Sequence, residues 1–263
     1  MRIVGVGQGL FAIATASLAL WSLEYGEFAW GAVPWRETWV YASALSILAA
    51  STGLWFPRTA LPSVLTIGVY QALGAAIAVP QILSKPLSVG AWYPFCEALT
   101  ALTGASLLYA MLRWESRGPG GMLIASRGAV RIAQVLYGLT CVFYGGSHFL
   151  YADYTAVMVP GWLPGHVAFA YLTGVGHLAA GIAIIFGILP RLAAVLEAVM
   201  MSLFGLLVWV PSAFEQPRPQ WATPPEHQWS ELAITLVLAA SAWIVAISLG
   251  SRSRAYAVQA RPV

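Results

Sequence analysis

Eight long apolar segments, separated by short polar or proline- and glycine-rich connections, dominate the pattern of hydrophobic positions along the chain. Each extends for roughly 18 to 23 residues, enough for a helix rising about 1.5 Å per residue to cross a hydrocarbon core of about 30 Å. In lipid each backbone amide needs an internal partner, so each segment is expected to be helical. The predicted spans are residues 3–22, 39–56, 61–82, 89–112, 130–150, 167–189, 192–210 and 231–250.

Composition agrees with this pattern. The 263 residues are 59% hydrophobic and only 9% charged, with a mean hydropathy of +0.75, whereas soluble domains carry about 25% charged residues. Short alternating segments, which are typical of outer-membrane barrels, are absent. We therefore expect an all-α polytopic membrane protein with eight transmembrane helices.

The positive charges are distributed unevenly between the two sides of the predicted membrane. With the N-terminus inside, ten of the thirteen Lys and Arg residues fall on the inner side and three, Arg36, Lys85 and Arg218, on the outer side. This bias predicts that both termini are cytoplasmic and that the protein is a multi-pass protein of the inner (plasma) membrane. The net charge of +3 therefore orients the chain in the lipid bilayer and does not indicate nucleic-acid binding.

The second group of four spans reads as an altered copy of the first. Aromatic, proline-arginine, valine-proline and acidic positions recur at offsets that drift from about 126 to 134 residues, as small loop insertions require. The matched pairs are Tyr25–Phe28 with Tyr151–Tyr154, Pro57-Arg58 with Pro190-Arg191, Val79-Pro80 with Val210-Pro211, and Glu97 with Glu231. The Val-Pro pairs are expected to close the third and seventh spans.

Because four is an even number of spans, the two copies share one orientation and are related by an axis along the membrane normal. We predict a first four-helix repeat at residues 1–115, a cytoplasmic linker at 116–128, a second repeat at 129–252 and a cytoplasmic tail at 253–263.

All four histidines lie in the second half. His177 comes about ten residues into its span, where an ionisable group is expensive and normally faces a protein interior or a water-filled cavity. It can serve as a proton relay, a metal or haem ligand, or a partner of a quinone or lipid head group. Alternatively it is structural and bonds a hydroxyl such as that of Tyr144 or Thr173. Gly174 and Gly181 flank His177 on one stripe, which should face protein.

His148 ends the fifth span, close in sequence to Tyr151 and Asp153. An imidazole, a phenol and a carboxylate are therefore expected to cluster at the outer boundary, unless these residues only anchor the helix at the interface. His148 and His177 are predicted to differ in depth by nearly 10 Å, unless the fifth helix runs on to Asp153. A haem held by both histidines is therefore disfavoured, as is a histidine-carboxylate metal site.

Three carboxylates lie within predicted spans. Glu97 and its counterpart Glu231 are expected either to line an outward-opening cavity or to cap helix starts, where acids are favoured. Glu197 is expected to be structural and to pair with Arg191, six residues earlier. Outside the spans, two prolines and two glycines deny a helix to Val159–His166, a connection that carries Trp162 at the headgroup level as part of a lid or a tight turn.

Four stretches of the second half resemble the DoxX-like membrane proteins: His148-Phe-Leu-Tyr151, Val159-Pro-Gly-Trp-Leu-Pro-Gly165, Tyr171-Leu-Thr-Gly-Val-Gly-His177 and Pro190-Arg-Leu-Ala-Ala194. The resemblance covers residues 130–250 directly and 1–112 through the duplication. Relatives of that family include the DoxD-type subunit of thiosulfate:quinone oxidoreductase. The resemblance thus implies a membrane-embedded, quinone-linked redox component. Cys96 and Cys141, however, form no CxxC pair.

Three classes of function follow. The first is a redox component, a membrane oxidoreductase subunit if it is catalytic, that binds a quinone or a similar lipid-soluble molecule in a polar cavity in the outer half of the membrane. There His148 and His177 would exchange protons with the substrate and Glu97 would relay them outward. The residues expected to line this site are Tyr144, Tyr151, Asp153, Trp162, Thr173 and Glu231. The other classes are a transporter or exporter with a midplane site, and a scaffold for a partner protein.

Overall fold

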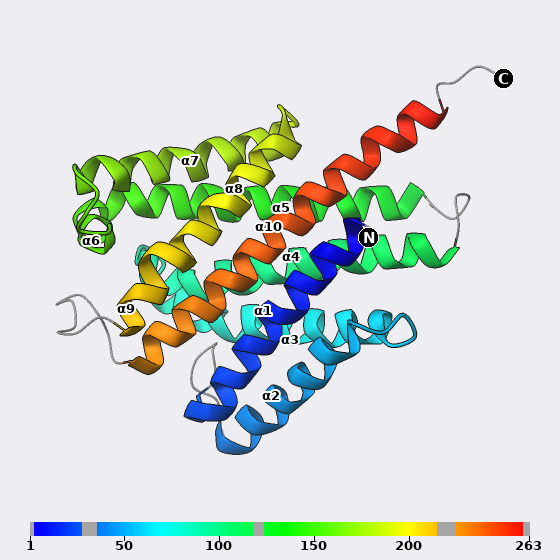
Figure 1. Ribbon diagram of the computed structural model, residues 1–263, viewed down its shortest axis with the longest axis horizontal. Coiled ribbons are helices and arrows are strands. Elements are labelled where there is room, and N and C mark those ends of the chain that lie inside the picture. Colours follow the sequence, from blue (N-terminus) through cyan, green and yellow to red (C-terminus); the bar gives the residue numbers. More distant parts are fainter. Residues whose placement is uncertain (1–2, 28–35, 118–123, 215–224, 260–263) are drawn as a thin grey trace.

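A computed structural model describes residues 3–27, 36–117, 124–214 and 225–259 (Figure 1). Within these ranges the chain consists of helices and connections, with no strand. The helices are α1 (Ile3–Tyr25), α2 (Arg36–Gly53), α3 (Ala60–Ser84), α4 (Val89–Arg117), α5 (Ile124–Leu150), α6 (Ala152–Met158), α7 (His166–Phe186), α8 (Pro190–Phe204), the π-helical turn η1 (Gly205–Trp209), α9 (Val210–Phe214) and α10 (Pro225–Gln259). The predicted all-α class is confirmed.

Six segments in the described ranges are long and apolar enough to cross a membrane: Gly5–Tyr25, Ala60–Ser84, Val89–Glu115, His166–Phe186, Pro190–Phe214 and His227–Gly250. They correspond to six of the eight predicted spans and indicate a membrane protein. Helices α2 and α5 cover the other two predicted segments but are not among the six.

Several predicted boundaries are displaced. Helix α3 continues through Pro80 to Ser84, and the helix that begins with α8 continues through Pro211 to Phe214, so the two Val-Pro pairs do not end their helices. In lipid a helix end exposes unpaired backbone groups, which favours continuation. The π-helical turn η1 ends at Trp209, two residues before Pro211, where a helix can accommodate the missing N–H of proline. The ends of the predicted linker are helical as far as Arg117 and again from Ile124, while residues 118–123 lie outside the described ranges.

The helices pack in a regular order. In the first half α1 contacts α2, α2 contacts α3 and α3 contacts α4; in the second half α5 contacts α7, α7 contacts α8 and α8 contacts α10. The two halves meet where α4 packs on α5, α1 on α10 and α4 on α10. Figure 1 shows α8, α10 and α1 side by side, running diagonally across the helices behind them.

Glycines allow α5 and α7 to approach closely. A Cβ atom on Gly145 would lie 2.8 Å from the carbonyl oxygen of Gly174, and one on Gly181 would lie 2.5 Å from that of Gly138. Backbone atoms thus occupy the space that side chains would need, as expected where packing, not hydrophobic burial, holds helices together. The prediction that Gly174 and Gly181 face protein is confirmed, since both are buried.

Candidate functional site

The buried stripe of α7 carries one ionisable residue. This stripe repeats every three or four residues and consists of Ala170, Gly174, His177, Ala180, Gly181 and Ile184. Because its other members are small or apolar, the imidazole of His177 lies among close-packed helices, with the residue 1% exposed. His177 therefore faces the protein interior and not the acyl chains.

His177 is paired with a buried carboxylate. Its Nδ1 atom lies 2.7 Å from Oε1 of Glu197 on α8, and the two side chains are each 2% exposed. The prediction that Glu197 pairs with Arg191 is therefore wrong, as is the suggestion that His177 bonds Tyr144 or Thr173. Glu197 projects from α8 toward α7, whereas Arg191 is exposed and lies against Gly250 of α10.

The other oxygen of Glu197 lies in an unusual setting. Electrostatic interactions connect the carboxylate with the thiol of Cys141 and the hydroxyl of Tyr137, both on α5. No hydrogen bond of normal geometry, however, reaches Oε2 from the described residues. An acceptor with no hydrogen bond costs about 1 to 3 kcal/mol, and the thiol of Cys141, a weak donor, can offset only part of that cost.

The second histidine lies against the first. The ring centroids of His148 and His177 are 5.1 Å apart in an edge-to-face arrangement, so the predicted depth difference of nearly 10 Å is wrong. The reason lies in the crossing of α5 and α7. A Cβ atom on Gly174 would lie 2.9 Å from Cβ of His148, which therefore packs over the turn of α7 that precedes His177.

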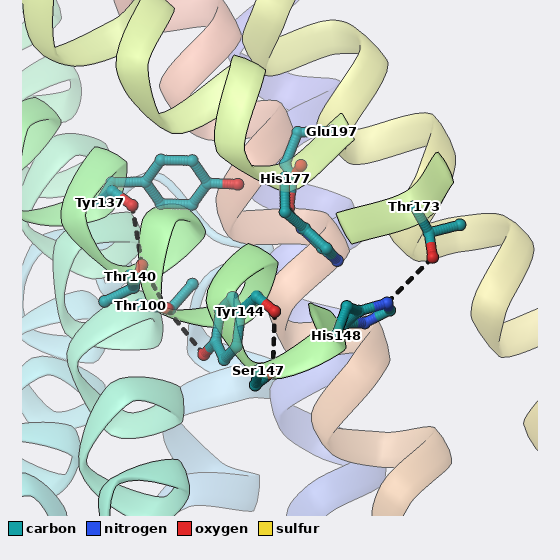
Figure 2. A network of polar contacts seen from close by, with 9 residues as sticks. All are labelled: Thr100, Tyr137, Thr140, Tyr144, Ser147, His148, Thr173, His177 and Glu197. Atoms are coloured by element: carbon teal, nitrogen blue, oxygen red, sulfur yellow. Dashed lines mark hydrogen bonds and ion pairs between the residues drawn. The ribbon is translucent and has the colours of Figure 1, made fainter. Parts of the chain in front are cut away.

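Hydrogen bonds fix the orientation of His148. Its Nδ1 atom lies 2.9 Å from Oγ1 of Thr173. The Thr173 hydroxyl in turn donates to the carbonyl oxygen of Phe169 or Ala170 in its own helix, so it accepts from His148 and Nδ1 carries the proton. Figure 2 shows this bond and the ring of His177 beside it.

In both imidazoles Nδ1 is engaged in a hydrogen bond, and Nε2 is the nitrogen left for a further partner. A carboxylate accepts from Nδ1 of His177 and a hydroxyl accepts from Nδ1 of His148, so each neutral ring has its lone pair on Nε2. In the described part of the chain, no hydrogen bond reaches either Nε2 atom. The pair can accept two hydrogen bonds, or two protons, from a small molecule.

Aromatic side chains enclose the pair. The ring of Phe204, just before η1, stacks on His148 at 6.0 Å and contacts His177 at 5.9 Å, and Tyr144 of α5 lies 5.9 Å from His177. The Tyr144 hydroxyl is 3.2 Å from Oγ1 of Thr100 on α4, which links this wall to the first half of the chain (Figure 2). The enclosure keeps lipid chains away from the imidazoles.

Glu97 and Glu231 form a second group of ionisable side chains, which interacts with Tyr144. The two carboxyl groups, on α4 and α10, interact electrostatically with each other, and Glu97 also interacts with Tyr93 and Tyr144. Tyr93 shares a hydrogen bond of 2.6 Å with Ser147. Within the described residues neither carboxyl group bonds His148 or His177, whereas Glu231 interacts electrostatically with His227.

Three predicted site residues lie elsewhere. Helix α5 ends at Leu150, and Tyr151 and Asp153 point outward and make no hydrogen bond or ion pair with His148 in the described ranges. The predicted cluster of His148, Tyr151 and Asp153 is therefore wrong. Trp162 is 71% exposed in a connection that is non-helical, as its prolines and glycines predict.

Sequence reasoning missed the role of Glu197 and Phe204. The pairing of Glu197 with His177 could have been predicted from the distance of each residue from the turn between their helices. Glu197 lies seven residues from Pro190, and His177 lies nine residues from Phe186, so both are at similar distances from the turn that joins α7 and α8. Counting from that shared turn would have paired them. Nothing in the sequence identifies Phe204.

Comparisons with known proteins identify a family but no activity. A family model described as a domain of unknown function (DUF8561) matches residues 136–246, less than half of the chain but the part that holds His148, His177 and Glu197. No curated protein and no solved structure matches. Among the described residues, no three His, Cys, Asp or Glu side chains form a group that could hold a metal ion.

Proposed function

We propose that the chain is a DoxX-like protein of eight transmembrane helices, arranged as two four-helix repeats about a pseudo-twofold axis between α4 and α10. The order of helix contacts supports this. Helices α1, α2, α3 and α4 correspond in that order to α5, α7, α8 and α10. With this correspondence, each contact between two of these helices in the first half has a counterpart in the second half. The pair α4–α5 becomes α10–α1, and α4–α10 maps onto itself.

The same proposal places both termini in the cytoplasm and the protein in the inner membrane. It is supported by the ten cations on one side and three on the other. The connection at residues 159–165 then faces outward and the α7–α8 turn faces the cytoplasm. The histidine pair lies between them, within the membrane.

For function, we propose a quinone-linked redox component in which His148, His177 and Glu197 exchange protons with a lipid-soluble substrate. The observation that carries this is the pair of imidazoles in contact, each with Nδ1 engaged and Nε2 available. Two acceptor nitrogens can receive the two protons that a quinol releases when it loses two electrons. Those electrons would go to a partner redox protein.

Glu197 has a definite part in this chemistry. When Nε2 of His177 takes up a proton, the ring becomes an imidazolium, and the carboxylate 2.7 Å from Nδ1 stabilises that charge. Tyr144 and Phe204 exclude water from the ring faces, which strengthens the electrostatic interaction. Glu97, which interacts with Tyr144, would pass protons toward the outer face.

The test is to purify the protein in a mild detergent, extract it with organic solvent and quantify quinone by chromatography. We expect quinone in near-stoichiometric amount, and its loss in His177→Gln and His148→Gln. His166→Gln is the matched control, because His166 lies at the start of α7, away from the pair. Absence of quinone from the parent protein, or equal retention in all three variants, contradicts the proposal.

A transporter is the second candidate, because two parallel repeats around a central interface are also an arrangement of transporters that rock between inward- and outward-open states. Single cysteines placed along the buried stripe of α7 would then react with impermeant reagents from both sides of the membrane. Under the redox proposal these cysteines react from one side of the membrane at most.

A further inference from the structure

One buried face of α5 is polar along most of its predicted span. The residues on this face recur at intervals of three and four, which places them on one side of a helix. They are Gln134, Tyr137, Cys141, Tyr144 and His148, and the first four are between 0% and 7% exposed. Polar side chains inside a membrane are expensive and usually functional. The histidine pair accounts only for the end of this face at His148.

The middle of this face adjoins the carboxylate of Glu197. The thiol of Cys141 interacts both with Glu197 and with the hydroxyl of Tyr137. Figure 2 shows the ring of Tyr137 directed toward the pair of His177 and Glu197. Oε2 of Glu197 is buried and receives no hydrogen bond of normal geometry from the described residues. Each of the four ionisable side chains, from His177 through Glu197 and Cys141 to Tyr137, therefore interacts with the next.

The first half of the chain indicates that helix packing does not require these polar groups. The offsets that match Tyr25 with Tyr151, Tyr41 with Tyr171 and Pro57 with Pro190 also give counterparts for the four side chains. The counterparts of His177, Glu197, Cys141 and Tyr137 are, in that order, Ile47, Val64, Thr15 and Phe11. Phe11, Ile47 and Val64 are 0%, 3% and 1% exposed and belong to one apolar cluster. Because hydrocarbon fills these positions in the first of the proposed repeats, the polar set in the second is better explained by chemistry.

The polar face of α5 reaches the half of the helix that precedes the site. Nε2 of Gln134 donates to Oγ of Ser248 on α10 at 3.0 Å, and Oε1 of Gln134 is buried with no hydrogen bond from the described residues. One turn earlier, the guanidinium group of the partly exposed Arg131 donates to the carbonyl oxygens of Ile184 and Ile185. In the proposed orientation this end of α5 faces the cytoplasm. Polar groups thus lead from the histidine pair to within one helical turn of a partly exposed cation.

We propose that Cys141 and Tyr137 relay protons between Glu197 and the cytoplasmic end of α5. A thiol and a phenol can each donate and accept a hydrogen bond. When Nε2 of His177 takes up a proton, its Nδ1 proton passes to Glu197 and the ring stays neutral. The carboxyl group ionises again as it gives a proton to the sulfur of Cys141, the thiol proton moves to the oxygen of Tyr137, and the phenol proton leaves toward Gln134. One proton enters, one leaves, and no member of the relay keeps a new charge.

This inference rests on the proposed proton chemistry of His177 but not on the identity of its substrate. Its test follows the Nδ1 proton of His177 by NMR. Full-length protein with nitrogen-15-labelled histidine is placed in bilayers and transferred to deuterium oxide, and the loss of each Nδ1–H signal is timed. The Nδ1–H group of His148, which bonds Thr173, is the internal control.

Variants of the two relay residues give the expected result. Cys141→Ala and Tyr137→Phe should slow exchange at His177 by roughly tenfold or more, a change of about 1.4 kcal/mol in the barrier. Cys141→Ser keeps a group that donates and accepts and should restore the parent rate, which a purely structural role of the thiol does not predict. Cys96→Ala removes the other buried cysteine and should leave the rate unchanged.

Two further variants test the direction of the relay. Gln134→Leu removes the acceptor at the cytoplasmic end and should also slow exchange at His177, whereas slower exchange in Tyr144→Phe would indicate a route through the outer half. The proposal is overturned if Cys141→Ala, Tyr137→Phe or Gln134→Leu leaves exchange at His177 unchanged, if Tyr144→Phe slows it, or if exchange at His148 slows equally. No quinone is added, so bound quinone with unchanged exchange rejects the relay alone. Slowed exchange in a protein that binds no quinone rejects only the redox role.

Discussion

Nδ1 of His177 lies 2.7 Å from Oε1 of Glu197, and neither side chain is more than 2% exposed. Two ionisable groups inside a membrane protein are costly to bury even as a pair, and an apolar pair of similar size is often as stable. Their presence on facing helices is therefore better explained by function than by stability. Each partner nevertheless depends on the other, and this has measurable consequences.

The first prediction concerns Glu197. Glu197→Ala leaves the Nδ1–H donor of His177 buried without its acceptor, which costs about 1 to 3 kcal/mol. Glu197→Gln retains an acceptor for Nδ1 and should cost distinctly less. Thermal unfolding in detergent measures both changes. Asp153→Ala removes an exposed acid as a control, and equal effects of the three substitutions would show that the buried pair has no special role.

The second prediction compares two adjacent glycines of α5. Gly145→Ala brings a methyl group 2.8 Å from the backbone of α7, whereas a Cβ atom on Gly146 would have no neighbour within 4 Å. We expect Gly145→Ala to lower stability by about 1 to 3 kcal/mol through overpacking. Gly146→Ala should be neutral or raise it by up to about 1 kcal/mol. The same unfolding measurement applies, and a harmless Gly145→Ala would refute the close α5–α7 contact.

The third prediction concerns the proton on His148. Thr173→Val removes the nearer of two acceptors for Nδ1 and leaves the carbonyl oxygen of Ala170 at 3.4 Å, so the preference for the tautomer with the proton on Nδ1 weakens. Nitrogen-15 NMR of histidine-labelled protein should show His148 shifting toward the other tautomer while His177, held by Glu197, stays unchanged. Thr66→Val is the control, because its hydroxyl bonds only within its own helix. An unchanged His148 spectrum would show that the Thr173 hydroxyl does not set the tautomer.

The fourth prediction tests the proposed orientation. Gly161 and Ile188 are both exposed, in the connections that precede and follow α7, and the two native cysteines are buried. In intact cells an impermeant maleimide should label Gly161→Cys but label Ile188→Cys only after the membrane is permeabilised. The reverse pattern would place the termini outside.

The positions of the helices along the chain were predictable from the sequence, because long apolar runs leave few alternatives. Runs of about 20 apolar residues can only be helices in lipid, and each predicted segment overlaps one long helix; the larger differences lie at the end of α4, at the start of α5, at Pro211 and at both ends of α10. The glycine stripe of α7 was also predictable, since Gly174 and Gly181 are a heptad apart.

The site was only partly predictable, because it depends on how two helices cross. Burial of His177 followed from its depth, but its contact with His148 depends on Gly174, over which His148 packs. Proximity in sequence favours Arg191 as the partner of Glu197, whereas the partner in the structure, His177, lies on another helix. The clustering expected for His148 and Asp153 failed for a similar reason: α5 ends at Leu150 and the chain turns outward.

The central claim is that Nε2 of His177 and Nε2 of His148 receive hydrogen bonds or protons from a lipid-soluble redox molecule. Its most direct test is the nitrogen-15 spectrum of histidine-labelled protein before and after addition of a short-chain quinol. The account predicts that the Nε2 resonances of His148 and His177 shift, while those of His166 and His227 do not. Unchanged resonances of both His148 and His177 at saturating quinol would contradict it.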